Sequence, residues 1–193
     1  MDRITVVNQI RCLLMTKLHV GCGWRDFGDD WTHIDGGEYP HIQYFNIRLE
    51  TFPDNHADVI YASHVFEYFD REEGLEVLNE WHRVLKPNGI LRLAVPDFSA
   101  MTSLYQKGEI KLDQILGPLY GKMKMSSKVI YHKTVYDYES LESILKESNF
   151  VNVSRYDWRE TEHAHHDDHS QAYIPHMDKE NGTLISLNVE AFK

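Results

Sequence analysis

The sequence KLHVGCG, residues 17–23, has the form of a short strand that ends in a glycine turn. Glycines at positions 21 and 23 let the backbone bend tightly and come close to a bound ligand. In doubly wound sheets, ligands bind at the carboxyl ends of the strands, where this turn would lie. A plain turn could use the same glycines, so the function of this stretch depends on the fold that the rest of the chain adopts.

Strand and helix patterns alternate along the rest of the chain, which predicts a Rossmann-like α/β fold with a doubly wound, mostly parallel sheet. The further strands are expected at residues 31–35, 42–47, 57–63, 90–97, 150–158 and 183–192. No helical pattern separates the last two strands, so they could form a terminal antiparallel pair. We find no internal repeat or long linker, and we expect a single domain over residues 1–193.

Two helices have clear boundaries in the sequence. The first begins after Asp70, where Glu73 completes a capping-box pattern, and it ends before Pro87. The second is expected over residues 138–149, with Asp137 as its N-terminal cap. Both repeat apolar residues at helical spacing, so each has a face that can be buried.

An acidic residue, Asp35, closes the second strand, twelve residues after Gly23. A carboxylate at that place can accept hydrogen bonds from both hydroxyls of a ribose. The dinucleotide fingerprint would require a third glycine at position 26, but Asp26 stands there. The glycine turn and the acid together favour a ribose-containing cofactor and argue against a nicotinamide-dependent oxidoreductase.

Four stretches resemble, in order, the successive motifs of class I S-adenosylmethionine-dependent methyltransferases: LHVGCG, HID, DVIYASHVFEYF and EWHRVLKPNGILRLAVPDF. The resemblance runs from about residue 17 to the C terminus. It implies a seven-stranded sheet in the order 3-2-1-4-5-7-6, with strand 7 antiparallel, and S-adenosylmethionine as the cofactor. The ending, from DDHSQAYIPHMDK onward, resembles a subgroup of short methyltransferases assigned to glycan or cell-surface sugar pathways.

The resemblance also implies which residues contact the cofactor. Gly21 and Gly23 would lie against its methionine part. Asp35 would bind the ribose hydroxyls, and Gly36 would flank the adenine.

Three further positions are implied by the same resemblance. Asn46 stands where relatives often have an aspartate that faces the adenine amino group, and its amide oxygen can still accept that hydrogen bond. Ser63 and His64, just past the strand at 57–63, would border the methyl group that is transferred.

The chain departs from the family pattern between its first two strands. Only seven residues, WRDFGDD at 24–30, separate Gly23 from the second strand. A crossover with a full helix needs a dozen or more residues, so we expect the first helix to be reduced to a turn.

An insertion at about 159–182 contains EHAHHDDHSQAYIPHMDK, which holds five histidines and four acidic residues. In the expected topology both ends of this segment emerge at the ligand side of the sheet, so it would lie beside the cofactor. It could be a solvated loop, a source of substrate contacts and a general base, or a divalent-metal site.

We favour the substrate-side interpretation. The candidates for a general base are Asp168, His169 and His176, with His64 and His132 in reserve. No fixed ligand spacing such as His-Glu-x-x-His occurs, so no metal is expected to be required. A second insertion, at about 99–135, could form a helical pair over the sheet edge or a lid over the acceptor.

The amino-acid composition limits the kinds of partner and compartment to be expected. The formal charge of −10 argues against binding to a nucleic-acid backbone. Cys12 and Cys22 are too few for a disulfide framework, and residues 1–15 contain neither a signal peptide nor a membrane span, so we expect a cytoplasmic protein. The oligomeric state is left open.

The resemblance alone points to a sugar or glycan hydroxyl as the methyl acceptor. The alternatives are O- or N-methylation of another small metabolite, or a protein that binds the cofactor without catalysis.

Overall fold

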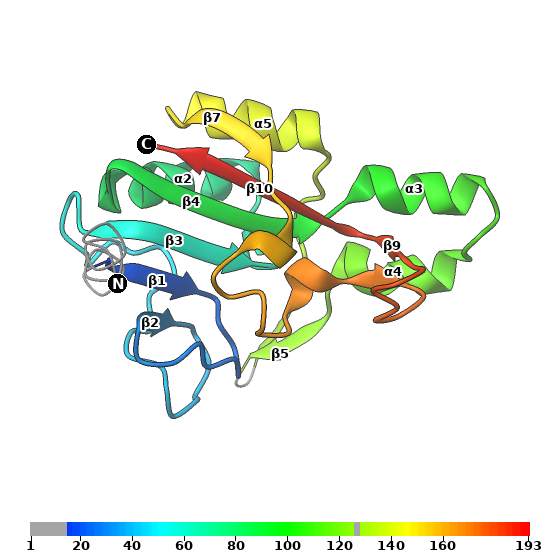
Figure 1. The fold of residues 1–193 in the computed structure, drawn as a ribbon, viewed down its shortest axis with the longest axis horizontal. Helices are drawn as coiled ribbons and strands as arrows, with labels where there is room; N and C mark the ends of the chain where they lie inside the picture. Colours follow the sequence, from blue (N-terminus) through cyan, green and yellow to red (C-terminus); the bar gives the residue numbers. More distant parts are fainter. Residues whose placement is uncertain (1–14, 126–127) are drawn as a thin grey trace, which may run out of the picture.

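The computed structural model describes residues 15–125 and 128–193. Its centre is a six-stranded sheet in the order β2-β1-β3-β4-β10-β7 (Figure 1). The strands are β1 (Lys17–Val20), β2 (Trp31–Ile34), β3 (Ala57–Ser63), β4 (Leu85–Pro96), β7 (Val151–Arg155) and β10 (Ser186–Phe192). Neighbours are parallel except at β10, which runs antiparallel to β4 and to β7. The mostly parallel sheet and its antiparallel final strand are therefore confirmed.

The expected seven-stranded order is wrong, because residues 42–47 do not form a strand in the described part of the chain. Tyr44 makes one isolated parallel bridge to Ile34, next to β2. The chain then turns away, since the Asn46 side chain accepts a hydrogen bond from Arg48 N at 3.0 Å. Such a local side-chain turn competes with strand pairing and leaves β2 at the edge of the sheet.

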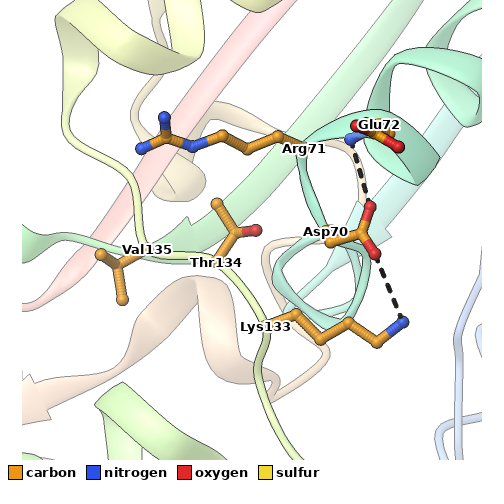
Figure 2. Close-up of a pocket in the computed structure, with 6 residues that line it drawn as sticks. All are labelled: Asp70, Arg71, Glu72, Lys133, Thr134 and Val135. Carbon is orange, nitrogen blue, oxygen red and sulfur yellow. Dashed lines mark hydrogen bonds and ion pairs between the residues drawn. The ribbon is translucent and has the colours of Figure 1, made fainter.

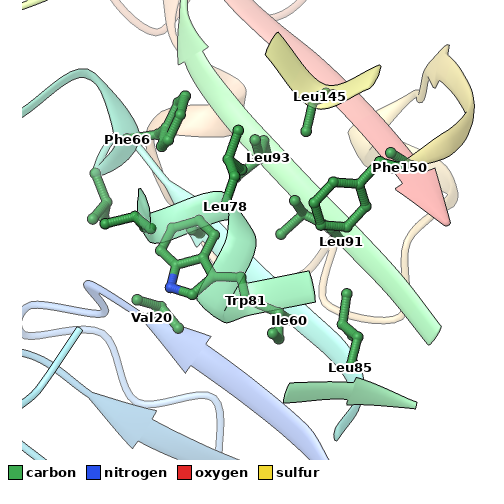
Figure 3. Close-up of a cluster of buried hydrophobic side chains, with 14 of the residues drawn as sticks. Val20, Ile60, Phe66, Leu78, Trp81, Leu85, Leu91, Leu93, Leu145 and Phe150 are labelled. Atoms are coloured by element: carbon green, nitrogen blue, oxygen red, sulfur yellow. The ribbon is translucent and has the colours of Figure 1, made fainter. Parts of the chain in front are cut away.

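The two expected helices form as α2 (Arg71–Val84) and α5 (Tyr138–Glu147). Asp70 accepts from the Glu73 amide, and the Glu73 side chain accepts from Asp70 N, so the capping box is confirmed. Figure 3 shows side chains of α2 and of strands β1, β3 and β4 gathered around Trp81, which is fully buried. Leu145 of α5 belongs to the same core, which places both helices on one face of the sheet.

The opposite face over β1, β2 and β3 is covered differently. The β1–β2 connection contains only turns, as its length predicts, and Phe27 from this connection packs on Trp31 and Tyr61. The loop that continues from β7 descends past the carboxyl end of β3 and lies beside the ends of β1 and β2 (Figure 1). His163 of that loop lies 4.2 Å from Tyr61, between ring centroids. The sheet is therefore not doubly wound by helices here, because the short crossover leaves a face that aromatic and histidine side chains fill.

The remaining elements lie at the carboxyl side of the sheet. The insertion after β4 forms α3 (Phe98–Gln106), α4 (Leu112–Tyr120) and the hairpin of β5 (Met123–Met125) and β6 (Lys128–Ile130). Helices α3 and α4 share an apolar cluster that includes Met101 and Ile115, so the insertion does contain a packed helical pair, and a role as a lid over the acceptor stays a prediction. The loop after β7 contains the 3-10 helices η2 (Trp158–Glu160) and η3 (His169–Gln171) and the short pair β8 (Tyr173–Ile174) and β9 (Thr183–Leu184).

Two expectations concern the N-terminal residues. Cys12 and most of the segment at 1–15 lie outside the described residues, whereas Cys22 is a buried free thiol. Within 15–125 and 128–193, no helix has the length and apolar character needed to cross a membrane.

Candidate active site

The glycine turn after β1 is fixed by two close approaches. Gly21 has φ +68°, and a Cβ at this position would lie 2.0 Å from Val65 Cγ2, so only glycine fits. The Gly21 amide donates to Ile34 O at 2.7 Å, which ties the turn to the end of β2. The sequence KLHVGCG therefore places its turn where the ends of β1, β2 and β3 meet.

Gly23 faces open space and holds the acid of the second strand. It has φ +57°, and a Cβ built there would meet no described atom within 4 Å. Its amide donates to Asp35 Oδ2 at 2.8 Å, and Gly37 N donates to Asp35 Oδ1 at 2.7 Å. A carboxylate has about four acceptor positions, so Asp35 can still accept from the two hydroxyls of a ribose.

Gly36 and Asn46, the two residues expected near the adenine, both have close neighbours within the protein. A Cβ on Gly36 would lie 3.1 Å from Met125 Sδ, so the end of β5 passes over this part of the edge. The Asn46 side chain donates to Glu50 and accepts from Arg48 N. Asn46 is thus engaged in its own turn, and only part of its hydrogen-bonding capacity remains for a ligand.

The end of β3 brings two polar residues to the same edge. The Ser63 hydroxyl is buried and has no hydrogen-bond partner among the described residues. His64 has φ +54°, a conformation that costs a non-glycine residue about 1–3 kcal/mol and that often marks functional sites. Its amide donates to Ala94 O at 2.8 Å, and its side chain is 13% exposed. Burial is the largest cause that lowers the pKa of His64, followed by His169 and His132, so the ring is neutral at pH 7.

Glu67 is a site residue that the sequence motifs do not single out. It lies in η1 (Phe66–Tyr68), one turn after His64, and its side chain is 1% exposed. Glu67 Oε1 lies 3.5 Å from His64 Nδ1 and 3.6 Å from His132 Nε2. Burial raises the pKa of Glu67 to about 8. The signal that could have revealed it is a single acid within the otherwise apolar stretch VFEYF.

The histidine-rich loop packs against both parts of this edge. Arg25, just past the glycine turn, donates from Nε to Asp167 O at 2.9 Å. The rings of Phe27 and His166 stack with centroids 4.3 Å apart. The ring of His169 lies 5.2 Å from that of His64. The loop therefore lies beside the glycine turn and the end of β3, where the strand directions predict it.

Asp168 is a poor candidate for the base, although its position suggested one. It is 4% exposed, and its Oδ1 accepts from the amide and the hydroxyl of Ser170 at 2.8 and 2.6 Å. Its Oδ2 accepts from the Tyr61 hydroxyl. These contacts use Asp168 to fasten the loop to β3, so its carboxylate does not face an acceptor.

The loop histidines have different surroundings. His163 is buried between Tyr61 and Arg92, and burial, followed by the charge of Arg92, lowers its pKa to about 4. His169 and His176 are exposed. Only His169 lies beside His64, so it is the loop histidine that the structure brings to the end of β3.

Two cavities lie near this edge without coinciding with the glycine turn. One, of about 560 Å³, is lined by Asp70, Arg71, Glu72, Lys133, Thr134 and Val135 (Figure 2). The other, of about 470 Å³, lies between η1 and β6 and includes His132. Figure 2 shows charged side chains at the start of α2 in the first cavity. None of the residues that line this cavity belongs to the ends of β1 or β3.

Three observations fit S-adenosylmethionine. Gly23 faces open space, Asp35 is fixed by two amides with acceptor positions left over, and Ser63 has an unpaired buried hydroxyl. For a metal the result differs. Within 15–125 and 128–193, no group of three histidine, cysteine or acidic side chains has the arrangement of a metal site.

Residues 30–93 match the family model of a methyltransferase domain. This stretch includes Asp35, Ser63 and His64 and ends inside β4. No curated protein sequence matches the chain.

Solved structures share the fold at low sequence identity. A SAM-dependent methyltransferase from Methanosarcina mazei has a TM-score of 0.57 at 17% identity, with 100% of this chain and 99% of that chain covered. One from Archaeoglobus fulgidus has a TM-score of 0.55 at 16% identity, with 100% and 95% covered. The 1,6-didemethyltoxoflavin-N1-methyltransferase of Burkholderia thailandensis, solved with bound 1,6-didemethyltoxoflavin and S-adenosylhomocysteine, has a TM-score of 0.54 at 13% identity, with 98% of this chain and 75% of that chain covered.

The solved structures show the fold, and the family model adds the activity. The site geometry agrees with both, since the glycine turn and Asp35 lie at the carboxyl edge of the sheet. The methyltransferase-domain match over residues 30–93 and the fold shared along the whole chain together indicate an S-adenosylmethionine-dependent methyltransferase, with S-adenosylmethionine as the cofactor.

Proposed function

We propose that this methyltransferase moves the methyl group to a hydroxyl of a sugar or glycan. The observation that carries the proposal is the position of His64, a neutral imidazole at the end of β3, beside Ser63 and two strands from Asp35. A hydroxyl acceptor must lose a proton during the transfer, and a neutral imidazole can take it.

This arrangement gives each of the chain's own residues a role. Asp35 would hold the ribose hydroxyls, and Gly23 would leave room for the cofactor beside the turn. Bound S-adenosylmethionine supplies a methyl group on a positively charged sulfur. Methyl transfer to the acceptor oxygen would leave the electrons of the C–S bond on sulfur, and His64 would take the hydroxyl proton. The protein contributes mainly by alignment of these groups.

The loop after β7 would form the acceptor side of the site. His169 and His176 are exposed there and could hydrogen-bond to sugar hydroxyls. Gln171 and Tyr173 are less suitable than their polarity suggests. Gln171 Nε2 donates to His166 O at 2.8 Å, and the Tyr173 hydroxyl accepts from Arg159, so both stabilise the loop itself.

The choice of a sugar rests on the resemblance of the C-terminal part to glycan-pathway methyltransferases. N-methylation of a small metabolite is the second candidate, because one protein of the same fold is an N1-methyltransferase. A nitrogen with a free lone pair needs no base, so the two candidates differ in their requirement for His64. A protein that binds the cofactor without catalysis would show no transfer with any acceptor.

The test uses calorimetry with S-adenosylmethionine, followed by transfer assays with mass detection on sugars, nucleotide sugars and small amines. Methylation of a sugar by the wild type, slowed by about a hundredfold in His64→Ala, supports the proposal. Methylation of an amine at equal rates in both proteins selects the second candidate. Cofactor binding without transfer to any acceptor selects the non-catalytic binder.

A further inference from the structure

We propose that Glu67 is a positioning residue that sets the tautomer of His64 and so decides when His64 can act as a base. The proposal rests on the proposed function, because it concerns the base that would take the hydroxyl proton. It assigns a role to a buried acid that the methyltransferase fold itself does not explain.

The carboxyl group of Glu67 is buried and shielded from solvent. Both of its oxygens are buried without a hydrogen-bond partner among the described residues, and its Oε1 lies 3.5 Å from His64 Nδ1 and 3.6 Å from His132 Nε2. A buried ionised carboxylate without hydrogen-bond donors destabilises the folded protein. Such a group is therefore expected to be protonated or to have donors close by.

The hydrogen bonds of His132 show which of its nitrogens faces Glu67. Its Nδ1 lies 3.0 Å from Pro118 O, and since a carbonyl only accepts, Nδ1 carries the proton. The neutral ring therefore presents the bare Nε2 to Glu67, 3.6 Å away. A bare nitrogen beside a carboxylate would be repulsive, whereas a protonated Glu67 can donate to it.

A second chain of hydrogen bonds defines the state of His64. Asn188 Nδ2 donates to Ser170 O at 2.9 Å, so its Oδ1 is free to accept from the Ser186 hydroxyl, also at 2.9 Å. The Ser186 oxygen is then left as an acceptor for His64 Nε2, 3.1 Å away. In this state Nε2 carries the proton and the bare Nδ1 faces Glu67, 3.5 Å away.

Both rings thus turn a bare nitrogen toward Oε1 of Glu67, and the single proton of a neutral carboxyl group can be donated to either one of them. In that form His64 has no lone pair at Nε2, so Nε2 cannot take a proton from an acceptor. When the cluster loses one proton, the proton of Glu67 moves to Nδ1 of His64 and the Nε2 proton leaves to solvent. The carboxylate then accepts from Nδ1–H of His64, and the lone pair is at Nε2.

The other ionisable groups around this cluster come from several elements. Tyr68 and Tyr136 lie near Glu67, His169 lies beside both histidines, and Arg25 acts on His64 from the glycine turn. Burial without an opposing positive charge raises the pKa of Glu67 to about 8. The change of tautomer is therefore expected as the pH rises through about 8.

Nuclear magnetic resonance on protein labelled with ¹⁵N-histidine tests this without knowledge of the acceptor. The ¹⁵N resonances of the His64 imidazole are assigned as those that are missing from the spectrum of His64→Asn. In the wild type they should change from the Nε2–H to the Nδ1–H pattern between pH 7 and pH 9. In Glu67→Gln, which cannot ionise, one pattern should persist over this range. Glu76→Gln, an exposed position on α2, should behave as the wild type.

The same proteins are then compared in methyl transfer. The wild-type kcat should rise with pH through about 8, whereas Glu67→Gln should lack this rise and bind S-adenosylmethionine with unchanged affinity. A change of tautomer in Glu67→Gln at the same pH, or its absence in the wild type, overturns the role of Glu67 and leaves the proposed transfer standing.

Discussion

The amide of Gly23 donates to Asp35 Oδ2 across 2.8 Å and so joins the carboxyl ends of β1 and β2. Gly37 N holds the other carboxylate oxygen at 2.7 Å. The carboxylate is therefore oriented by the backbone before a ligand binds, which lowers the entropy that binding must remove. Two motifs that stand twelve residues apart in the sequence thus form one preorganised carboxylate, which we propose as the acceptor for the ribose hydroxyls.

Removal of the Asp35 carboxylate should weaken S-adenosylmethionine binding. Asp35→Ala leaves the ribose hydroxyls and two amides without their partner, and we expect a loss of about 1–3 kcal/mol in calorimetry. Asp29→Ala, on the exposed β1–β2 connection, is the matched control and should bind normally. Equal affinity in Asp35→Ala and the wild type would remove Asp35 from the cofactor site.

The two glycines of the turn should differ in their sensitivity to alanine. A Cβ on Gly21 would strike Val65, whereas a Cβ on Gly23 meets open space, although both have positive φ. Gly23→Ala should cost about 1–2 kcal/mol of unfolding free energy from backbone strain alone. Gly21→Ala should cost more than that, because the clash adds to the strain.

Chemical denaturation of both variants measures the difference. Equal costs for the two substitutions would mean that the end of β3 yields easily at Val65, and that Gly21 is not required by packing.

Glu67 should also make the stability of the protein depend on pH. Its pKa is raised by burial from 4.5 to about 8 in the folded state, so the folded protein holds a proton that the unfolded chain has lost. This contribution is fully present below pH 4.5 and falls between pH 4.5 and 8, by up to about 1.4 kcal/mol per pH unit.

Glu67→Gln removes that slope, because an amide does not titrate. The variant should therefore gain stability relative to the wild type as the pH rises from 5 to 8. The measurement is the free energy of unfolding of both proteins at several pH values. If the difference between the two proteins stays constant from pH 5 to 8, Glu67 keeps an ordinary pKa in the folded protein.

Asp168 should matter for stability more than for chemistry. Asp168→Ala leaves the Tyr61 hydroxyl and the Ser170 amide without an acceptor, and each buried unpaired group costs about 1–3 kcal/mol. The expected result is a lower unfolding midpoint, with kcat of the folded fraction much less affected. A hundredfold fall in kcat with unchanged stability would restore Asp168 as the base.

Patterns that act over a short range were predictable from the sequence. The capping box at Asp70, the glycine turn and the lost crossover helix each depend on residues within a dozen positions of one another. The position of the histidine-rich loop was predictable too, because strand direction fixes the edge from which a connection leaves.

Features that depend on distant partners were not predictable. IQYFNI has the pattern of a strand, but Asn46 closes a turn that prevents pairing beyond Tyr44. Asp168 looks like a free carboxylate until Tyr61, 107 residues away, is found as its donor. The proposed role of Glu67 depends on His132, which follows α3, α4 and the β5–β6 hairpin, and no local pattern places it near η1.

The most direct test is transfer of a deuterated methyl group from S-adenosylmethionine to a panel of sugars and nucleotide sugars, read by mass spectrometry, with wild type and His64→Ala side by side. We predict a methylated sugar with the wild type, and a rate lower by about a hundredfold with His64→Ala, at equal cofactor affinity. A wild-type protein that binds the cofactor and methylates amines but no hydroxyl, or a His64→Ala variant with the full rate, would contradict hydroxyl transfer by this base.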